Sequence, residues 1–512
     1  MRTTVIGVNR LSHSVRERRA AQVCCPSSPI IREPFSDMDV LDPQEVHDSP
    51  DPARPEPSQD AAVLLEQIEQ ACRHLKMAQS TFGRLAVNDG KLVTRLQQGG
   101  RVTLTTVERV HRFIEAQGGS PMDTLRSAIR GLNVAAAAPD FRFFDNRQKY
   151  LMFVNTTSEK RLIADRALRV MEETQPQSPA LRVMDAGAGD GTALARIMRG
   201  MHRRHPHAPF YVVAKEISME NVRLILEKMA DRLQEHPATV LVITNLKFSE
   251  ALRMKPHPPS AASSMIWHEQ ALDGNSAGDF EEQIAELDPW LAQYWSARIS
   301  TGSGNPVYRT PMVLVLYRRD HRFALEPLLP RRGVARADFD FILASHPYRA
   351  RASLDFKAGD VMTSLVRGLR ANGRLLGVQA YGRDDAMELV QRIWPGENPF
   401  MAGREDILAR VEQNLGASAQ DFEFHHQPDE EAVFTYSLRA MLTELDPHVP
   451  MGGSTILAAW NAATYMAQIE DDRLAQAMTT DGYRQSTREI LLKHQGLAFR
   501  NETFVISRRA TW

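Results

Sequence analysis

The chain has 512 residues, 43% of them hydrophobic, and its formal net charge is −1 at pH 7. This length allows two or three domains, and the near-zero charge gives no electrostatic reason to expect a polyanionic partner for the whole chain. Three cysteines (Cys24, Cys25 and Cys72) offer neither a disulfide framework nor a metal-binding spacing, which is typical of a reducing, cytoplasmic compartment. No apolar run approaches the ~18 residues of a membrane-spanning helix.

The first 60 residues have a composition that disfavours a packed core. Residues 1–32 are rich in arginine and almost free of acids, as in transit peptides or in extensions upstream of a misassigned start. Met38 is a plausible true start, so residues 1–37 need not belong to the protein. Residues 33–60 carry nine acids, one base and six prolines. We predict that residues 1–60 are disordered, because they cannot bury enough apolar surface.

Residues 61–117 predict a small helical domain. Apolar side chains recur at helical spacing in four short segments, with a tight turn between the second and third. The run Met77-Ala-Gln-Ser-Thr-Phe-Gly-Arg-Leu-Ala-Val-Asn-Asp-Gly-Lys-Leu-Val-Thr-Arg-Leu96 resembles the repressor-like helix-turn-helix domains of bacteria. The resemblance implies that Lys91, Thr94 and Arg95 enter the DNA major groove. The net charge of this domain is only +3, so a helical bundle that contacts protein is an equal alternative.

Residues 118–140 are interpreted as a linker, because they hold two adjacent glycines and four consecutive alanines. The remainder, 141–512, is predicted to form one α/β domain. It opens with an aromatic-rich stretch that includes Phe144 and Tyr150, and a helix over 159–172 follows.

The segment 181–192 reads Leu-Arg-Val-Met-Asp-Ala-Gly-Ala-Gly-Asp-Gly-Thr and predicts a buried strand, a glycine turn and a helix over 192–204. Asp185 ends the strand, and glycines in such a turn let the backbone approach a nucleotide. The three glycines are Gly187, Gly189 and Gly191. Their spacing differs from the Gly-x-Gly-x-x-Gly of dinucleotide-binding proteins. It resembles the first motif of class I S-adenosylmethionine-dependent methyltransferases, and a glycine turn in an ordinary α/β protein is the alternative.

This resemblance implies a seven-stranded, doubly wound, Rossmann-like sheet that binds S-adenosyl-L-methionine at its strand ends. The second strand is predicted at 210–214, followed by Glu216, where this fold places a carboxylate that accepts from the ribose hydroxyls. The third strand, 239–245, ends at Asn245, in the region that contacts the adenine in this family.

Two pairs of segments compete for the fourth and fifth strands. We prefer 339–348 for the fourth strand with its following loop and 372–378 for the fifth, after an Asn-Gly turn, because the loop lengths are then ordinary. The alternative pair is 265–268 and 313–316. The preferred pair leaves an insertion at about 246–336 with elements of its own: strands at 264–267 and 312–317 and an aromatic-rich helix at 280–295.

The resemblance also implies an antiparallel sixth and seventh strand at the end of the sheet. Residues 421–437 and 503–507 are the candidates. The helices predicted between them, at about 438–500, would form a second insertion that serves as a lid or as part of the acceptor pocket.

Methyl transfer is an in-line displacement at a sulfonium methyl, so the enzyme mainly positions two reactants and excludes water. Ser345, His346 and Tyr348 follow the predicted fourth strand and are the catalytic candidates. His346 can take a proton, and Tyr348 can orient the acceptor. A hydrogen-bonded loop histidine without a catalytic role is the alternative. No cluster of histidines and carboxylates has metal-ligand spacing, so no metal is predicted.

The sequence therefore predicts an S-adenosylmethionine-dependent methyltransferase that acts on a small molecule or a protein. The loop after Ala344 lacks the Asn-Pro-Pro-Tyr or Asp-Pro-Pro-Tyr of enzymes that methylate amino groups of bases or of glutamine, and it lacks the Tyr-x-Asp expected for aminopropyl transfer. A different class is a transcriptional regulator, in which 61–117 binds DNA and the Rossmann-like domain senses S-adenosylmethionine or a metabolite.

Overall fold

The computed structural model describes residues 147–300, 305–440 and 451–510, Leu445, His448 and parts of 64–114. In the last segment the described residues are 64, 65, 68, 69, 71–73, 75, 77–87, 89–98, 106, 109, 110, 113 and 114. The predicted tail (1–60), the linker (118–140) and Phe144 lie outside the described residues. The chain divides into two compact units, Met1–Val134 and Ala135–Trp512, and each is described by itself.

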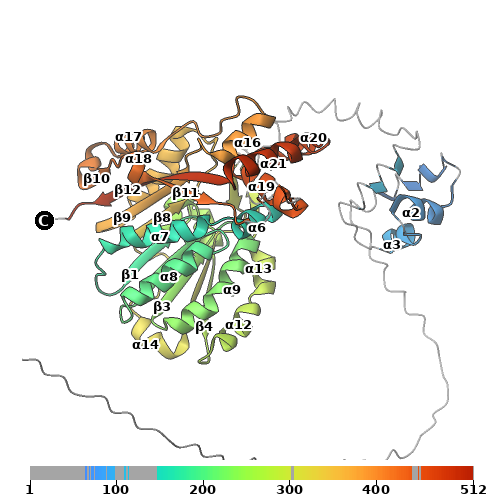
Figure 1. Cartoon of the computed structure of the whole chain (residues 1–512). Helices are drawn as coiled ribbons and strands as arrows, with labels where there is room; N and C mark the ends of the chain where they lie inside the picture. The colour runs from blue at the N-terminus through green and yellow to red at the C-terminus, as the bar shows by residue number, and fades with distance from the viewer. Residues whose placement is uncertain are drawn as a thin grey trace, which may run out of the picture. The chain divides into compact units, whose positions relative to one another are not determined.

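A ten-stranded mixed sheet forms the centre of the larger unit (Figure 1). Its order is β10-β12-β9-β8-β1-β2-β3-β7-β4, with β11 paired to β12 beside β10. The five strands from β9 to β3 are parallel, whereas β12 is antiparallel to β9 and β7 is antiparallel to β3. The strands are β1 (Leu181–Asp185), β2 (Phe210–Lys215), β3 (Thr239–Thr244), β4 (Ile266–Leu272), β7 (Met312–Arg318), β8 (Phe339–Ser345), β9 (Leu369–Ala380), β10 (Phe422–His425), β11 (Val433–Ser437) and β12 (Ala498–Arg508). A separate hairpin pairs β5 (Ala297–Ile299) with β6 (Pro306–Tyr308).

The alternation of side chains along each strand divides the apolar core into two layers. In β2, Phe210 and Val212 pack into one layer, and Tyr211 and Val213 pack into the other. All four side chains are buried, because helices cover both faces of the sheet. Continuous apolar runs such as that of β3 are therefore the expected sequence for the central strands.

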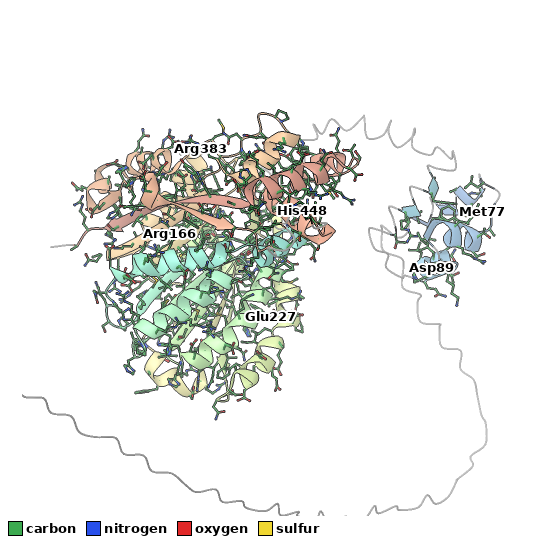
Figure 2. All side chains as sticks on the ribbon, in the orientation of Figure 1. Met77, Asp89, Arg166, Glu227, Arg383 and His448 are labelled. Atoms are coloured by element: carbon green, nitrogen blue, oxygen red, sulfur yellow. The ribbon has the colours of Figure 1, made fainter. Side chains whose placement is uncertain are left out.

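Helices α7, α8 and α9 lie across the face of the sheet that Figure 1 turns to the viewer. The helices that contribute to the core on this side are α6 (Arg147–Thr156), α7 (Glu159–Glu172), α8 (Thr192–Arg204), α9 (Met219–Glu235), α12 (Ala277–Ala285), α13 (Asp288–Tyr294), α16 (Asp385–Ile393), α19 (Gly453–Met466), α20 (Asp471–Ala477) and α21 (Gly482–His494). Arg166 reaches from α7 to β11, where it donates to Val433 O at 3.3 Å (Figure 2).

The opposite layer is formed by α10 (Phe248–Ala251), α14 (Arg322–Leu325), the π-helix η2 (Phe356–Thr363), α15 (Ser364–Val366) and α17 (Arg404–Leu415). The remaining short helices are α11 (Pro259–Ser264), α18 (Asp429–Ala432), η1 (Arg319–His321) and η3 (Gly416–Asp421). Within the described part of the chain, no helix has both the length and the apolar character needed to cross a bilayer.

The sheet is larger than the seven strands predicted, since it has ten strands. β7 and β4 of the 246–336 insertion extend it beyond β3: β7 pairs with β3, and β4 pairs with β7. The alternative pair 265–268 and 313–316 was wrong, since the neighbours of β1 are β2 and β8. β9 begins at Leu369, so the predicted Asn-Gly turn lies inside this strand, at an irregularity of its register with β8.

Two predicted helical regions are also divided more finely. The aromatic-rich helix at 280–295 is two helices, α12 and α13, and α13 begins at Asp288 with Pro289 in its first turn. The described residues of the insertion near the carboxyl end form three helices, α19, α20 and α21, of which two follow each other closely over 471–494.

In the smaller unit, α2 (Gln79–Val87) and α3 (Leu92–Gln97) are joined by a tight turn. A Cβ at Gly83 would lie 2.3 Å from Asp89 O, so only glycine fits at this close approach. Phe82 is buried and meets Phe113 edge to face, with ring centroids 5.3 Å apart.

Candidate functional site

A cavity of about 570 Å³ lies at the carboxyl ends of the parallel strands. Seven of the predicted site residues line it: Gly187, Gly189, Glu216, Asn245, Ser345, His346 and Tyr348. They come from the segments that follow β1, β2, β3 and β8, which meet at one edge of the sheet as parallel strands require. Residues from α6, α7, α9, α19, η2 and β6 are also part of the lining.

The glycine turn after β1 is closed on one side by Tyr150 of α6. The Tyr150 hydroxyl accepts from Asp190 N at 2.9 Å and lies 3.1 Å from Asp190 Oδ1. Gly189 has φ +55°, and a Cβ there would lie 2.3 Å from Tyr150 Oη. Gly191 has φ +78° and serves as the N-cap of α8 against Ile225. The turn therefore requires glycine at two positions for different reasons, although Gly191 is not part of the cavity wall.

Asp185 shapes the turn and does not line the cavity. Its Oδ1 accepts from Gly187 N at 3.2 Å, and the side chain is nearly fully buried. Burial raises the pKa of Asp185 to about 7, against the lowering effect of the Gly187 N–H and Lys160.

Glu216 lies where the resemblance places a ribose-binding carboxylate. Its Oε1 accepts from Ile217 N at 2.8 Å and from Ser218 N at 2.9 Å, and these bonds fix the side chain at the end of β2. Burial raises the pKa of Glu216, while the Ser218 N–H and Lys215 lower it. Asn221 of α9 lines the cavity beside it, so donors and acceptors for a diol are present together.

Asn245 lines the cavity, but its amide is bonded to the protein. Nδ2 donates to Thr310 O at 2.9 Å, and Oδ1 accepts from Met312 N at 2.8 Å. The side chain thus joins the end of β3 to the start of β7, which the sequence could not show without the pairing of these strands.

The loop after β8 holds His346 in a left-handed backbone conformation, with φ +47°. His346 Nε2 lies 3.0 Å from Glu159 Oε1 and 3.2 Å from Asn501 Nδ2. Asn501 Nδ2 also donates to Glu159 Oε1 at 3.0 Å. Because an ionised carboxylate only accepts, the proton of a neutral His346 belongs on Nε2, and Nδ1 is then the free acceptor.

Glu159 is the most important residue of this group that the sequence analysis missed. It is 2% exposed, and its Oε2 lies 3.1 Å from Lys160 Nζ. Burial alone would raise the pKa of Glu159, but Lys160 and His346 outweigh burial and hold it below its usual range. Its position at the start of a helix gave no signal, since acids are common in a first helical turn.

Tyr348 and Ser345 differ in their hydrogen bonding. Tyr348 Oη donates to Gln379 Oε1 at 2.9 Å, and Gln379 Nε2 donates to Glu502 Oε1 at 2.7 Å. Burial raises the pKa of Tyr348, so the hydroxyl stays neutral. Ser345 Oγ is buried and has no hydrogen-bond partner among the described residues, which leaves it available to a ligand in the cavity.

Within the described ranges, no group of three or more histidines, cysteines and carboxylates is arranged to hold a metal ion. In the smaller unit, Lys91, Thr94 and Arg95 are exposed, and Arg95 forms an ion pair with Asp89 at 2.8 Å. Their DNA-binding role stays a prediction.

No protein-family model matches the chain, and a search of curated proteins finds no match. Among solved structures, the chain is similar to a proposed sarcosine dimethylglycine methyltransferase from Galdieria sulphuraria, at 9% identity and a TM-score of 0.28 over 69% of this chain and 85% of that one. It is also similar to geranyl diphosphate methyltransferase in complex with geranyl diphosphate and sinefungin, at 11% identity and a TM-score of 0.26 over 68% and 78%. A third is a proposed class I S-adenosylmethionine-dependent methyltransferase from Listeria monocytogenes, at 9% identity and a TM-score of 0.23 over 89% of each chain. With TM-scores this low, any assignment of function rests on the cavity itself.

Proposed function

We propose that this protein is an S-adenosylmethionine-dependent methyltransferase that acts on a small molecule or a protein. The observation that carries the proposal is the cavity, in which the glycine turn, Glu216 and the loop after β8 meet. One cavity thus holds a nucleotide-type cradle and a histidine with a carboxylate partner, as a two-substrate transfer requires.

The cofactor half fits S-adenosylmethionine by its shape and its donors and acceptors. Gly187 and Gly189 present bare backbone to the cavity, and Glu216 offers a carboxylate for the ribose hydroxyls. When bound, S-adenosylmethionine supplies a methyl group on a sulfonium, which an acceptor can attack without metal assistance.

The acceptor half supplies a base. His346 Nδ1 takes the proton that a hydroxyl or other weakly acidic acceptor loses, and Glu159 stabilises the resulting imidazolium through Nε2. Asn501 holds Glu159 in place through the same carboxylate oxygen. A neutral amine would need no such base, so the Glu159–His346 pair favours an acceptor that must lose a proton.

The test is calorimetric titration of the full chain with S-adenosylmethionine. We expect micromolar affinity for the natural sequence and a loss of about 10- to 100-fold for Glu216→Gln, since hydrogen bonds to a charged group contribute about 1.5–3 kcal/mol. Glutamine keeps an oxygen for Ile217 N and Ser218 N, so the end of β2 is preserved.

The matched control is Glu227→Gln on the exposed face of α9 (Figure 2), which removes the same charge outside the cavity. It should bind as the natural chain does. If the folded natural chain shows no binding, the proposed function is overturned; if both variants bind equally well, the role of Glu216 is overturned.

A further inference from the structure

The π-helix η2 places a lysine against the acceptor half of the cavity. Lys357 is 2% exposed and lines the cavity, and its ammonium lies 5.3 Å from the ring centroid of Tyr348. Single π-helical turns inside helical segments are frequent at functional sites, because they turn side chains off the regular helical path.

Lys357 has no carboxylate partner among the described residues. None of their carboxylates lies within ion-pair distance of its ammonium, and the ammonium faces the ring of Tyr348. Glu502 acts on it from a distance, but that carboxylate is bonded to Gln379 and to Arg404 Nη1 at 3.2 Å. A buried cation without a counter-ion is costly, and an anion in the cavity would relieve that cost.

The surroundings of Lys357 indicate which anion fits. The side chains of Tyr348, Phe356, Phe400, Tyr465 and Met466 line the same cavity. This lining suits a ligand with an apolar body. Other cations also line the cavity; Lys160 among them is paired with Glu159, whereas Lys357 lies against the aromatic ring of Tyr348. One ammonium among aromatic side chains suits a singly charged carboxylate, whereas a phosphate is more often held by several arginines or by a helix N-terminus.

We propose that Lys357 binds the carboxylate of the methyl acceptor, and that the acceptor is a small carboxylic acid with an apolar or aromatic body. That this carboxylic acid is the methyl acceptor rests on the proposed function. Lys357 then orients the acceptor by its anionic end, so that its reacting atom is presented to His346 in the same cavity.

The experiment titrates the full chain, without cofactor, with benzoate and with its neutral analogue benzamide. We expect benzoate to bind at least tenfold more tightly than benzamide. Lys357→Met should abolish this preference, because methionine keeps an unbranched chain of similar length without the charge. Lys493→Met on α21 is the control, since Lys493 is an exposed lysine outside the cavity lining that pairs with Glu388 at 2.8 Å.

Equal binding of the two probes, an absence of benzoate binding, or a preference that persists in Lys357→Met would each overturn the proposal. If Lys357→Met does not fold, Lys357→Gln replaces it, and the preference of the natural chain for benzoate still decides. The titration with S-adenosylmethionine is independent. Binding of S-adenosylmethionine without benzoate preference overturns only the carboxylate site, and the reverse result overturns only the proposed function.

Discussion

The two halves of the cavity are built in opposite ways. Apart from Tyr150 of α6, the cofactor half comes from one continuous stretch, 185–245, in which β1, β2 and β3 are each followed by residues that line the cavity. The acceptor half joins segments that are distant in the chain. Asn501 and Glu159, which share a hydrogen bond beside His346, are 342 positions apart.

This difference explains what each half can tolerate. In the cofactor half, backbone geometry determines the shape, so the sensitive positions are glycines and strand ends. In the acceptor half, charged side chains determine the shape, so the sensitive positions are Glu159, Lys160 and Lys357. Glu159 and Lys357 contact residues of the loop after β8, and Lys160 pairs with its neighbour Glu159. Variants of the two kinds should therefore fail in different measurements.

The largest effect is expected at the glycine turn. Gly189→Arg should lower the affinity for S-adenosylmethionine at least a thousandfold, about 4 kcal/mol, because the side chain fills the cradle. Its Cβ would already lie 2.3 Å from Tyr150 Oη. Calorimetric titration measures the loss.

Gly187→Ala is the control for this variant. A Cβ at Gly187 would lie 3.4 Å from Ser345 O, an ordinary contact, so the free energy of unfolding should change by no more than about 0.5 kcal/mol. Undiminished affinity in Gly189→Arg would place the cofactor away from this turn and remove the contrast between the halves.

In the acceptor half, Glu159→Gln should lower the free energy of unfolding by about 3 kcal/mol, because it leaves the charge of Lys160 buried beside a neutral amide. The folded pKa of Glu159 lies below its ordinary value of 4.5. Its stabilisation is therefore fully present above about pH 4.5 and is lost as the pH falls. Urea unfolding at a series of pH values measures this stabilisation. The difference in free energy of unfolding between the natural chain and Glu159→Gln should shrink in acid.

The exposed Glu173, at the C-cap of the same helix, provides the matched control. Glu173→Gln should change stability by no more than about 0.5 kcal/mol, since its pair with Arg374 lies at the surface. Nitrogen NMR of His346 gives a second readout: the Nε2–H tautomer of the natural chain should become mixed in Glu159→Gln. A stability difference that does not depend on pH would argue against an ionised Glu159.

The sequence predicted features that depend on neighbouring residues better than features that depend on distant segments. The helices at 159–172 and 192–204 have the predicted ends, because their periodicity and the glycine turn are local signals. β8 and β9 were selected correctly by loop length. Strands were also predicted at 264–267 and 312–317, but not that they would extend the sheet beyond β3, because an apolar run does not identify the strand with which it pairs.

The acceptor half could be predicted only in part, because the sequence does not show which distant segments meet there. His346 was found because it follows a strand, whereas Glu159 and Lys357 occupy ordinary helical positions. A buried charge is recognised by what surrounds it, and these surroundings come from segments far along the chain.

A smaller effect is expected from pH at Lys357. Burial lowers its pKa to about 8, so the affinity for benzoate should fall about tenfold between pH 7 and 9 as the ammonium loses its proton. The groups that face it do not reverse this sign. Tyr348 stays neutral because burial raises its pKa, Glu502 is held by Arg404 and Gln379, and Asp360 is exposed to solvent. A constant affinity across this range would show that another group binds the carboxylate.

The smallest effect on ligand binding is expected at Asn245, and it tests whether every residue of the cofactor half serves the cofactor. Asn245→Ala removes the acceptor of Met312 N and the donor to Thr310 O, so the free energy of unfolding should fall by about 1 kcal/mol. The affinity for S-adenosylmethionine should stay within about threefold, less than 1 kcal/mol, because both polar ends of the side chain face protein. Glu216→Gln is the opposite case, with a large loss of affinity and little loss of stability. If Asn245→Ala instead behaves as Glu216→Gln does, the amide turns toward the ligand on binding, and β7 is attached to β3 by backbone hydrogen bonds alone.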